Sequence, residues 1–173
     1  MKRLSLLALA IAMAACVIAS AASTAGGADD GASPIDGITI PAGYRQWELV
    51  SVAHEAGDYD DLRATLGNTL AMTAFRNGKL PFPDGTIIAR LAWKYVPSAE
   101  NNKVFGQSQS FIAGAATNVQ FMVKDSKKYA ATGGWGFAVF TDGKPGDEAV
   151  HKTCFSCHEP AKVHDFVFTR YAP

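Results

Sequence analysis

The chain has 173 residues with 16 basic and 16 acidic side chains, so its formal net charge is zero. This balance argues against a nucleic-acid partner, because nucleic-acid-binding proteins carry an excess of Lys and Arg on one face. The length predicts a single domain with a hydrophobic core of its own.

The first 25 residues have the composition of an export signal. Lys2 and Arg3 give a basic start, and residues 4–15 form an apolar run that is too short to span a bilayer. Small residues follow the run, as is usual before a signal-peptide cleavage site. We therefore expect residues 1–25 to be removed and the mature protein to be periplasmic.

Cys16 supports a different interpretation of the same segment. Residues 13–16 resemble the cysteine-containing box of bacterial lipoproteins, so lipid anchoring through Cys16 is the alternative. After the signal, residues 26–40 are rich in Gly, Ala, Asp and Ser and predict a flexible leader. The folded domain is expected to cover residues 41–173.

The rest of the chain predicts a strand-rich domain with short helices. Alternation of apolar and polar residues predicts strands over 44–53, 86–96, 117–124, 135–141 and 165–171. Short helical segments are predicted over 69–76, 125–129 and 147–153, the first with Asn68 as its N-cap. We expect a single α+β domain that is mainly antiparallel β, and not a helical bundle.

The segment Cys154-Phe-Ser-Cys157-His158 near the C-terminus has the Cys-x-x-Cys-His pattern by which c-type haem is attached. Two thiols must each bond one vinyl group of the haem, and an imidazole must then reach the iron. On one turn of a helix these three side chains share a face. We interpret Cys154 and Cys157 as the covalent attachment residues of one haem c and His158 as its axial iron ligand.

Two other sites begin with the same pair of cysteines. A redox dithiol needs only Cys-x-x-Cys, without the histidine that follows here. A structural zinc site needs about four ligands, usually in two separated pairs, and His151 and His164 are the nearby extra candidates. The export signal favours haem over both alternatives.

The chain resembles the cytochrome P460 family, which includes the β-type cytochromes c′. The resemblance runs from about Tyr44 to Pro173. It is carried by residues 44–47, 82–86, 123–126, 134–135, 154–158 and 165–170. The resemblance implies a β-rich, often dimeric fold with a C-terminal c-haem attachment segment. Some members oxidise hydroxylamine and carry a lysine cross-link to the porphyrin, whereas others bind nitric oxide or carbon monoxide at a crowded distal face.

Two residues depart from the pattern of the hydroxylamine-oxidising members. The cross-linking lysine falls on Arg90, and arginine is always protonated and a poor nucleophile. Lys94 shares a strand face with Arg90 but lies roughly 13 Å further along. The distal glutamate falls near Gln120, whose amide cannot take a proton as a carboxylate does. Both departures argue against full hydroxylamine oxidase activity.

The sequence leaves two functions open. In the first, a five-coordinate haem has an open distal pocket formed by Arg90, Gln120, Phe121 and Met122, and it binds or redox-converts a small gaseous or nitrogenous ligand. In the second, Met122 is a second axial ligand, and the protein is a six-coordinate electron carrier for a soluble redox partner. In either case Arg170 is a candidate contact for a haem propionate.

Overall fold

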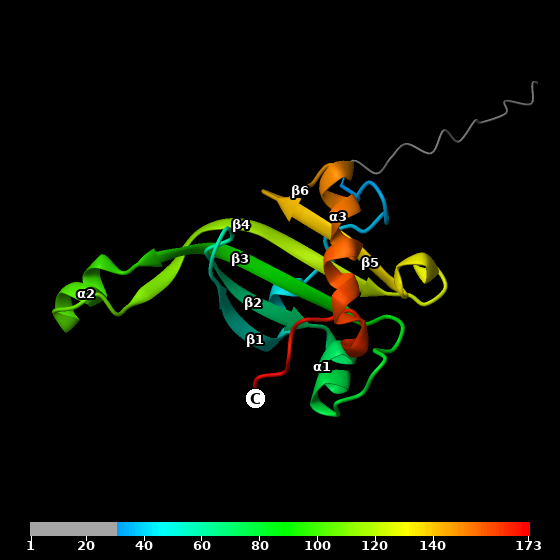
Figure 1. The fold of residues 1–173 in the computed structure, drawn as a ribbon, viewed down its shortest axis with the longest axis horizontal. Coiled ribbons are helices and arrows are strands. Elements are labelled where there is room, and N and C mark those ends of the chain that lie inside the picture. The colour runs from blue at the N-terminus through cyan, green and yellow to red at the C-terminus, as the bar shows by residue number, and fades with distance from the viewer. Residues whose placement is uncertain (1–30) are drawn as a thin grey trace, which may run out of the picture.

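The computed structural model describes residues 31–173, so the predicted signal peptide and Cys16 lie outside the described residues. Within that range the chain forms a six-stranded antiparallel sheet whose strands follow sequence order (Figure 1). The strands are β1 (Glu48–Glu55), β2 (Asp61–Gly67), β3 (Ile87–Pro97), β4 (Phe111–Lys124), β5 (Trp135–Thr141) and β6 (Lys144–Pro145). The helices are α1 (Thr69–Arg76), α2 (Ala99–Phe105) and α3 (Glu148–His158), with 3-10 turns η1 (Tyr44–Gln46), η2 (Ala130–Thr132) and η3 (Glu159–His164). The predicted α+β, mainly antiparallel domain is confirmed.

Most predicted elements occur where the sequence pattern places them. β3, β4 and β5 overlap the three strands predicted between residues 86 and 141. The helix α1 begins directly after Asn68, whose side-chain oxygen accepts a hydrogen bond from the N–H of Ala71 at 2.9 Å. This bond satisfies one of the free N–H groups in the first turn of the helix, which is why the capping prediction holds.

The strand predicted over residues 165–171 is wrong. Asp165 and Phe166 have φ angles of 54° and 64°, which lie in the left-handed region and turn the chain away from an extended course. The segment after them runs along the helices without joining the sheet, and the N–H of Ala172 donates to the carbonyl of Val50 on β1 at 2.9 Å.

The described part of the predicted flexible leader is packed on the domain. Ser33 and Ile38 are buried, and the N–H of Ile38 donates to the Ser33 hydroxyl at 3.0 Å. The carboxylate of Asp36 accepts a hydrogen bond from the N–H of Phe137 on β5 at 2.6 Å. Because this bond covers a free N–H of β5, residues 33–38 extend the folded unit beyond the predicted start at residue 41.

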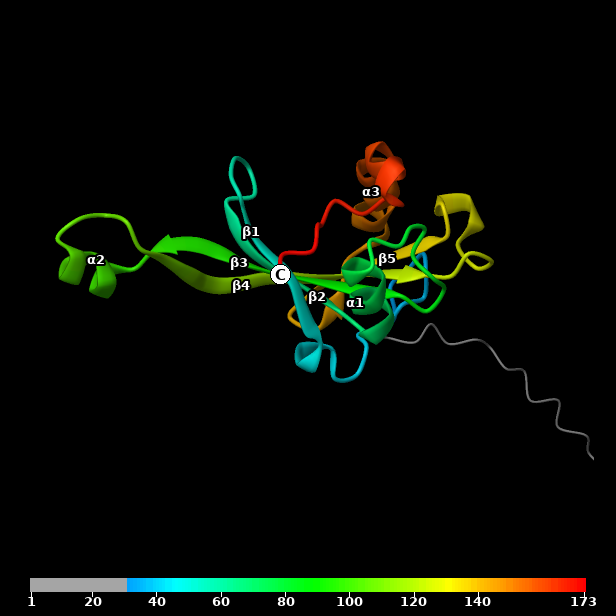
Figure 2. The same ribbon diagram turned by 90° about the horizontal axis from the view of Figure 1, so that it is seen from below.

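The sheet separates two packed layers, and α3 and the segment before β1 lie on opposite sides of it (Figure 2). One face, which we call the helix face, carries Ile88, Met122 and Phe137 side by side in the strand register and packs against Cys154 of α3. The other face is covered by residues 38–47. A functional group attached to α3 therefore lies against the helix face.

β3 and β4 continue beyond the other strands as a two-stranded arm that ends in α2 (Figure 1). Its polar contacts are internal: the side-chain oxygen of Asn102 accepts hydrogen bonds from the N–H groups of Gln109 and Ser110 at 3.0 and 2.7 Å. Val104 and Phe105 at its tip are exposed. The arm is thus a projection from the domain and contributes little to its core.

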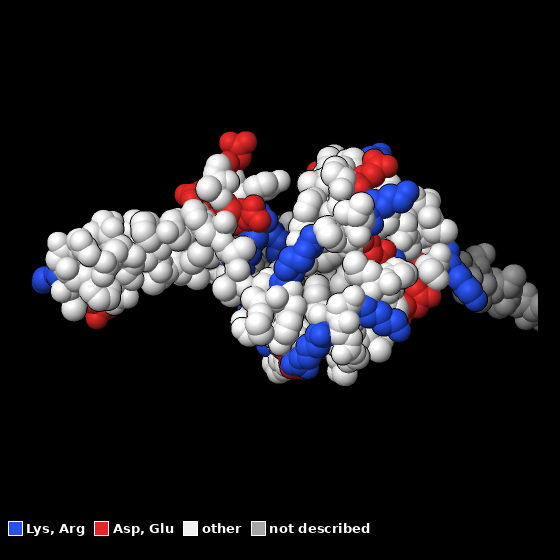
Figure 3. All heavy atoms as spheres, turned by 60° about the horizontal axis from the view of Figure 1, so that its bottom comes forward, with Lys and Arg blue, Asp and Glu red and all other residues white. Residues whose placement is uncertain are grey.

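Charged side chains are distributed unevenly over the surface. Figure 3 shows acidic side chains gathered at the turn between β1 and β2, where Glu55, Asp58 and Asp60 are exposed, and basic side chains scattered over the rest of that face. None of the helices in residues 31–173 is long and apolar enough to cross a membrane.

Candidate haem site

The Cys-x-x-Cys-His segment lies on a helix, as its spacing predicts. Asp147 caps α3 by accepting a hydrogen bond from the N–H of Val150 at 2.9 Å, and the helix then runs without interruption to His158. Cys154, Cys157 and His158 occupy its last two turns. Three and four residues of separation bring the two thiols and the imidazole to one side of the helix.

His151 fixes α3 against the edge of the sheet. Its ring is buried, with Nδ1 donating to the carbonyl of Asp147 at 2.8 Å and Nε2 accepting from the N–H of Val139 on β5 at 3.2 Å. Together with the Asp36–Phe137 bond, this contact satisfies the free edge of β5. The sequence pattern indicates His151 only as a candidate zinc ligand, and this structural role was not predicted.

The His158 ring is oriented by one hydrogen bond and two aromatic neighbours. Its Nδ1 donates to the carbonyl of Phe166 at 2.7 Å, and its centroid lies 5.0 Å from Phe137 and 5.2 Å from Phe168. Burial lowers the pKa of His158, whereas the bond to Phe166 acts in the opposite direction. The ring is thus favoured in its neutral form, and Nε2 makes no hydrogen bond to residues 31–173. A neutral imidazole with one nitrogen held and the other free is the form that binds a metal.

Cys154 and Cys157 are free cysteines that differ in exposure. Cys154 is half-buried and Cys157 is exposed, and no disulfide joins them. Burial raises the pKa of the Cys154 thiol, and the nearby Asp36 carboxylate and Cys157 raise it further. A redox-active dithiol has a lowered thiol pKa, so this environment disfavours the dithiol interpretation.

The zinc interpretation also finds little support. Both ring nitrogens of His151 are occupied by backbone groups, and the side chain points to β5. Within residues 31–173 no group of three or more His, Cys, Asp and Glu side chains has a metal-binding arrangement. The nearby ligands that a structural zinc site requires are therefore not assembled around the two cysteines.

Arg90 lies on the helix face, but its guanidinium is already engaged. It donates to the Asp61 carboxylate at 2.8 Å and to the side-chain oxygen of Asn118 at 3.2 Å. Arg63 donates to the other oxygen of Asp61 at 2.7 Å and pairs with Glu55 at 2.8 Å. Burial lowers the pKa of Arg90, the neighbouring Arg63 lowers it further, and Asp61 opposes both. Arginine remains charged under such a shift, so Arg90 presents a fixed positive charge.

Gln120 lies beside Arg90 in the strand register, between it and Val139. Its side chain is half-buried and makes no hydrogen bond to another residue of the described range. Arg90 and Gln120 are therefore neighbouring polar residues on the helix face, and their place in a distal pocket stays a prediction. The Asp61–Arg63 contact that holds Arg90 was not predicted.

Phe121 does not lie with them. Adjacent residues of a strand point to opposite faces, and Phe121 is buried in the layer opposite α3, where its ring meets Tyr44 at 5.1 Å and Phe140 at 5.9 Å. Its assignment to a distal pocket with Gln120 is corrected by this position. Met122 lies on the helix face in one cluster with Phe137 and is almost fully buried.

Arg170 is exposed and bonds to its own segment. One terminal nitrogen donates to the carbonyls of Val167, Phe168 and Thr169 at 3.2, 3.0 and 3.4 Å. The side chain also lines a cavity of about 140 Å³ beside the end of α1. The structure gives Arg170 a role in shaping the segment after the haem motif, and its propionate contact stays a prediction.

A protein-family model described as cytochrome P460 matches residues 41–169, which is most of the chain. The chain belongs to the cytochrome P460 family. The resemblance found in the sequence is thereby confirmed, and membership in the cytochrome P460 family implies a haem cofactor and a c-type haem protein. A search of curated proteins returned no match.

The residues of this cytochrome P460 domain fit such a haem. The two free thiols lie on consecutive turns of α3, and the His158 ring has one nitrogen held by Phe166 and the other free. Phe168, which contacts the ring, is 56% exposed, so apolar surface is available beside the imidazole for a flat apolar group.

Proposed function

We propose that the protein is a periplasmic mono-haem c-type cytochrome whose haem is bonded to Cys154 and Cys157 and ligated by His158. One face of the iron would stay open for a small nitrogen species such as nitric oxide or hydroxylamine. The observation that carries this proposal is the His158 ring, which is hydrogen-bonded through Nδ1 and free at Nε2, and whose pKa is lowered by burial. When bound, the haem supplies a redox-active iron that takes up small diatomic or nitrogenous ligands.

The residues around the motif orient the ligand side chain. His151 holds α3 on β5 at one end, and the Phe166 carbonyl fixes the rotation of the His158 ring at the other. Phe137 lies under the same ring. An imidazole restrained in this way would hold a bound metal in a constant orientation.

Arg90 and Gln120 would supply polar groups on the helix face. Arg90 is held by Asp61 and contributes a stationary positive charge, whereas the Gln120 amide is free to donate or accept a hydrogen bond. Neither group takes a proton near neutral pH. This set supports binding of a small ligand better than a reaction in which protons must be removed from hydroxylamine.

The position of Met122 bears on the electron-transfer alternative. As a second iron ligand, Met122 would have to reach a bound haem from the side opposite His158. Met122 instead packs in the same cluster as Phe137 and Phe166, the two residues that support the His158 ring. This position favours an apolar packing role for Met122 and an open second site.

Location and partners are part of the proposal. The predicted signal over residues 1–25 supports export to the periplasm, with lipid anchoring through Cys16 as the alternative. A soluble redox partner and a homodimer are proposed from the family resemblance, and the balanced charge supports no nucleic-acid partner.

The proposal is tested on protein produced with a cytochrome c maturation system. Haem should stay with the chain on a denaturing gel. Cys154→Ser and Cys157→Ser should each lower the amount of covalently attached haem, whereas Ser156→Ala should leave that amount unchanged. The reduced protein should bind nitric oxide, and Gln120→Leu should change the affinity. Loss of haem from the wild-type chain on denaturation, or a ferrous protein that does not bind nitric oxide, would contradict the proposal.

A further inference from the structure

Two consecutive non-glycine residues after the haem motif adopt left-handed backbone conformations. Asp165 and Phe166 have φ angles of 54° and 64°. Such conformations are costly for residues with a side chain and persist only where the surroundings hold them, often at functional sites. The carbonyl of Phe166, the second of these residues, accepts the hydrogen bond from His158.

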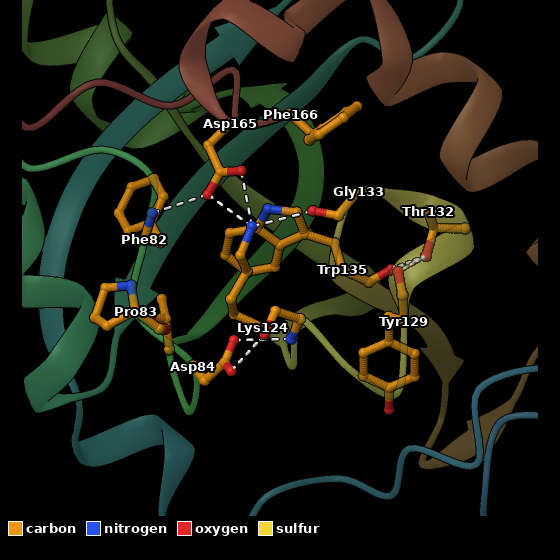
Figure 4. Close-up of polar contacts among 12 residues, drawn as sticks. Phe82, Pro83, Asp84, Lys124, Tyr129, Thr132, Gly133, Trp135, Asp165 and Phe166 are labelled. Carbon is orange, nitrogen blue, oxygen red and sulfur yellow. Dashed lines mark hydrogen bonds and ion pairs between the residues drawn. The ribbon is translucent and has the colours of Figure 1, made fainter.

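A buried ion pair holds the first of these residues (Figure 4). The ammonium of Lys124, at the end of β4, lies 2.7 and 2.9 Å from the two carboxylate oxygens of Asp165, and both side chains are largely buried. Lys124 also donates to the carbonyl of Gly133 at 3.1 Å. The N–H of Phe82 donates to Asp165 at 2.9 Å. Three hydrogen bonds therefore fix the Asp165 carboxylate between the end of β4 and the loop before β3, and a fourth bond holds Lys124 in place.

The second residue is held from the other side. The N–H of Phe166 donates to the carbonyl of Ala161 at 3.0 Å, and its ring lies 5.6 Å from that of Phe155. A Cβ atom on Gly133 would approach the Phe166 ring to 2.2 Å, so only glycine fits there. Phe166 has little freedom to shift its carbonyl away from His158.

We infer that the Lys124–Asp165 pair is a positioning device that presses the Phe166 carbonyl against Nδ1 of His158 and thereby sets the donor strength of the axial ligand. The inference rests on the proposed function, because it assigns His158 to the iron. Lys124 and Asp165 are positioning residues, since each acts on His158 through the backbone of Phe166.

The charges explain why the pair takes this form. A carboxylate bonded directly to Nδ1 would make the imidazole a much stronger donor. Asp165 directly precedes Phe166, the residue whose carbonyl bonds Nδ1, but the negative charge of Asp165 is balanced by Lys124. His158 therefore faces a neutral carbonyl at a fixed 2.7 Å, which gives a ligand of moderate and constant basicity.

The test compares holoproteins that carry Asp165→Asn and the double change Lys124→Met with Asp165→Asn. The control is Asp84→Asn, which removes a carboxylate that bonds Ser126 in the same region but does not touch the 165–166 turn. The readouts are the reduction potential and, in the ferrous protein, the iron–histidine stretching frequency. We expect both test variants to raise the potential and lower the frequency, with the control unchanged.

The double variant covers the case in which Asp165→Asn alone leaves Lys124 as an unpaired buried charge and fails to fold. Gly133→Ala is a third route, because it displaces the Phe166 ring without altering either charge. Folded variants with lowered stability but an unchanged potential and frequency would overturn the inference and leave the pair a purely structural contact. Failure of the proposed function would appear in the wild-type protein itself, as haem that is not attached or not ligated by His158.

Discussion

At the scale of single residues, His151 carries the contact that fixes the haem-bearing helix on the sheet. It bonds the carbonyl of Asp147 within α3 and the N–H of Val139 on β5, and it is buried. His151→Phe keeps an aromatic ring at this position but leaves the N–H of Val139 without a partner. We expect a loss of about 1–3 kcal/mol in the free energy of unfolding, measured by denaturant titration of the holoprotein.

The matched control for His151 is its neighbour Lys152. Lys152 forms an exposed ion pair with Glu148 one turn earlier at 2.7 Å. Exposed pairs of this kind contribute about 0.3–0.5 kcal/mol, so Lys152→Ala should be nearly neutral. An equal loss in both variants would mean that α3 is held by general helix stability and not by the bond to β5.

Asp84 is expected to give part of the acid sensitivity of the fold. Its carboxylate accepts hydrogen bonds from the hydroxyl and the N–H of Ser126, and these bonds lower the pKa of Asp84. A carboxyl group with a lowered pKa stabilises the fold above its unfolded value, about pH 4, and that contribution disappears as the pH falls through the folded value. Asp84→Asn should therefore lower stability at pH 7, with a difference from wild type that shrinks below about pH 4.

The measurement is the denaturation midpoint at several pH values between neutral and strongly acidic. Asp142→Asn is the control, because Asp142 is an exposed turn residue whose carboxylate makes no hydrogen bond within residues 31–173. A difference between wild type and Asp84→Asn that stays constant with pH would show that the hydrogen bonds of Asp84 are not linked to its charge.

Single-residue chemistry was the most predictable part of the site. The identities and spacing of Cys154, Cys157 and His158 suffice to predict their shared helix turn, since helical geometry fixes it. The partner of His158 could not be predicted, because a backbone carbonyl eight residues later leaves no signature in side-chain identities. Phe121 was misplaced, although strand alternation alone puts it on the face opposite Gln120 and Met122.

At the scale of elements, the strand β2 and the segment after the haem motif show how well the alternation of apolar and polar residues predicts strands. β2 has regular alternation, but two of its side chains on the helix face are the charged Asp61 and Arg63, which pair with each other and with Arg90. Alternation of apolar and polar residues is the pattern of a half-buried strand, so β2 could be predicted from the sequence even though ion pairs occupy its covered face. Residues 165–171 show the reverse case, in which apolar alternation is real but the left-handed turn at Asp165 prevents pairing.

Gly133 links the η2 turn to the segment that supports His158. It has a φ of 68°, and a Cβ there would lie 2.2 Å from the Phe166 ring. Gly143 has a similar φ of 77° but open space around it. Gly143→Ala should cost about 1 kcal/mol through backbone strain alone. Gly133→Ala should cost clearly more, because the ring must also move.

Denaturant unfolding of the two glycine variants checks this expectation. Equal losses in the free energy of unfolding would mean that the Phe166 ring moves aside at no energetic cost. The close packing of Gly133 against this ring would then contribute nothing to stability.

At the scale of the whole molecule, the domain and the arm are expected to behave as separate parts. The arm satisfies its polar groups internally, through Ser98 as the cap of α2 and Asn102 as the acceptor for the return strand. Replacement of residues 98–110 by Asn-Gly should close β3 and β4 as a hairpin. We expect unchanged haem attachment and an unchanged ferrous spectrum, because the arm lies away from α3 (Figure 1).

The measurement is the haem-to-protein ratio and the absorption spectrum of the shortened protein. A loss of attached haem would show that the arm takes part in forming the haem site. Val104 and Phe105 expose apolar surface at the tip of the arm, so that result would point to a contact between the arm and a second copy of the chain.

The ferrous absorption spectrum shows whether the iron is ligated by His158 alone. We expect a high-spin spectrum of the reduced protein that changes when carbon monoxide or nitric oxide is added, in the wild type and equally in Met122→Leu. A low-spin ferrous spectrum that carbon monoxide does not change, and that becomes high-spin in Met122→Leu, would exclude the open iron site and establish the six-coordinate electron carrier in its place.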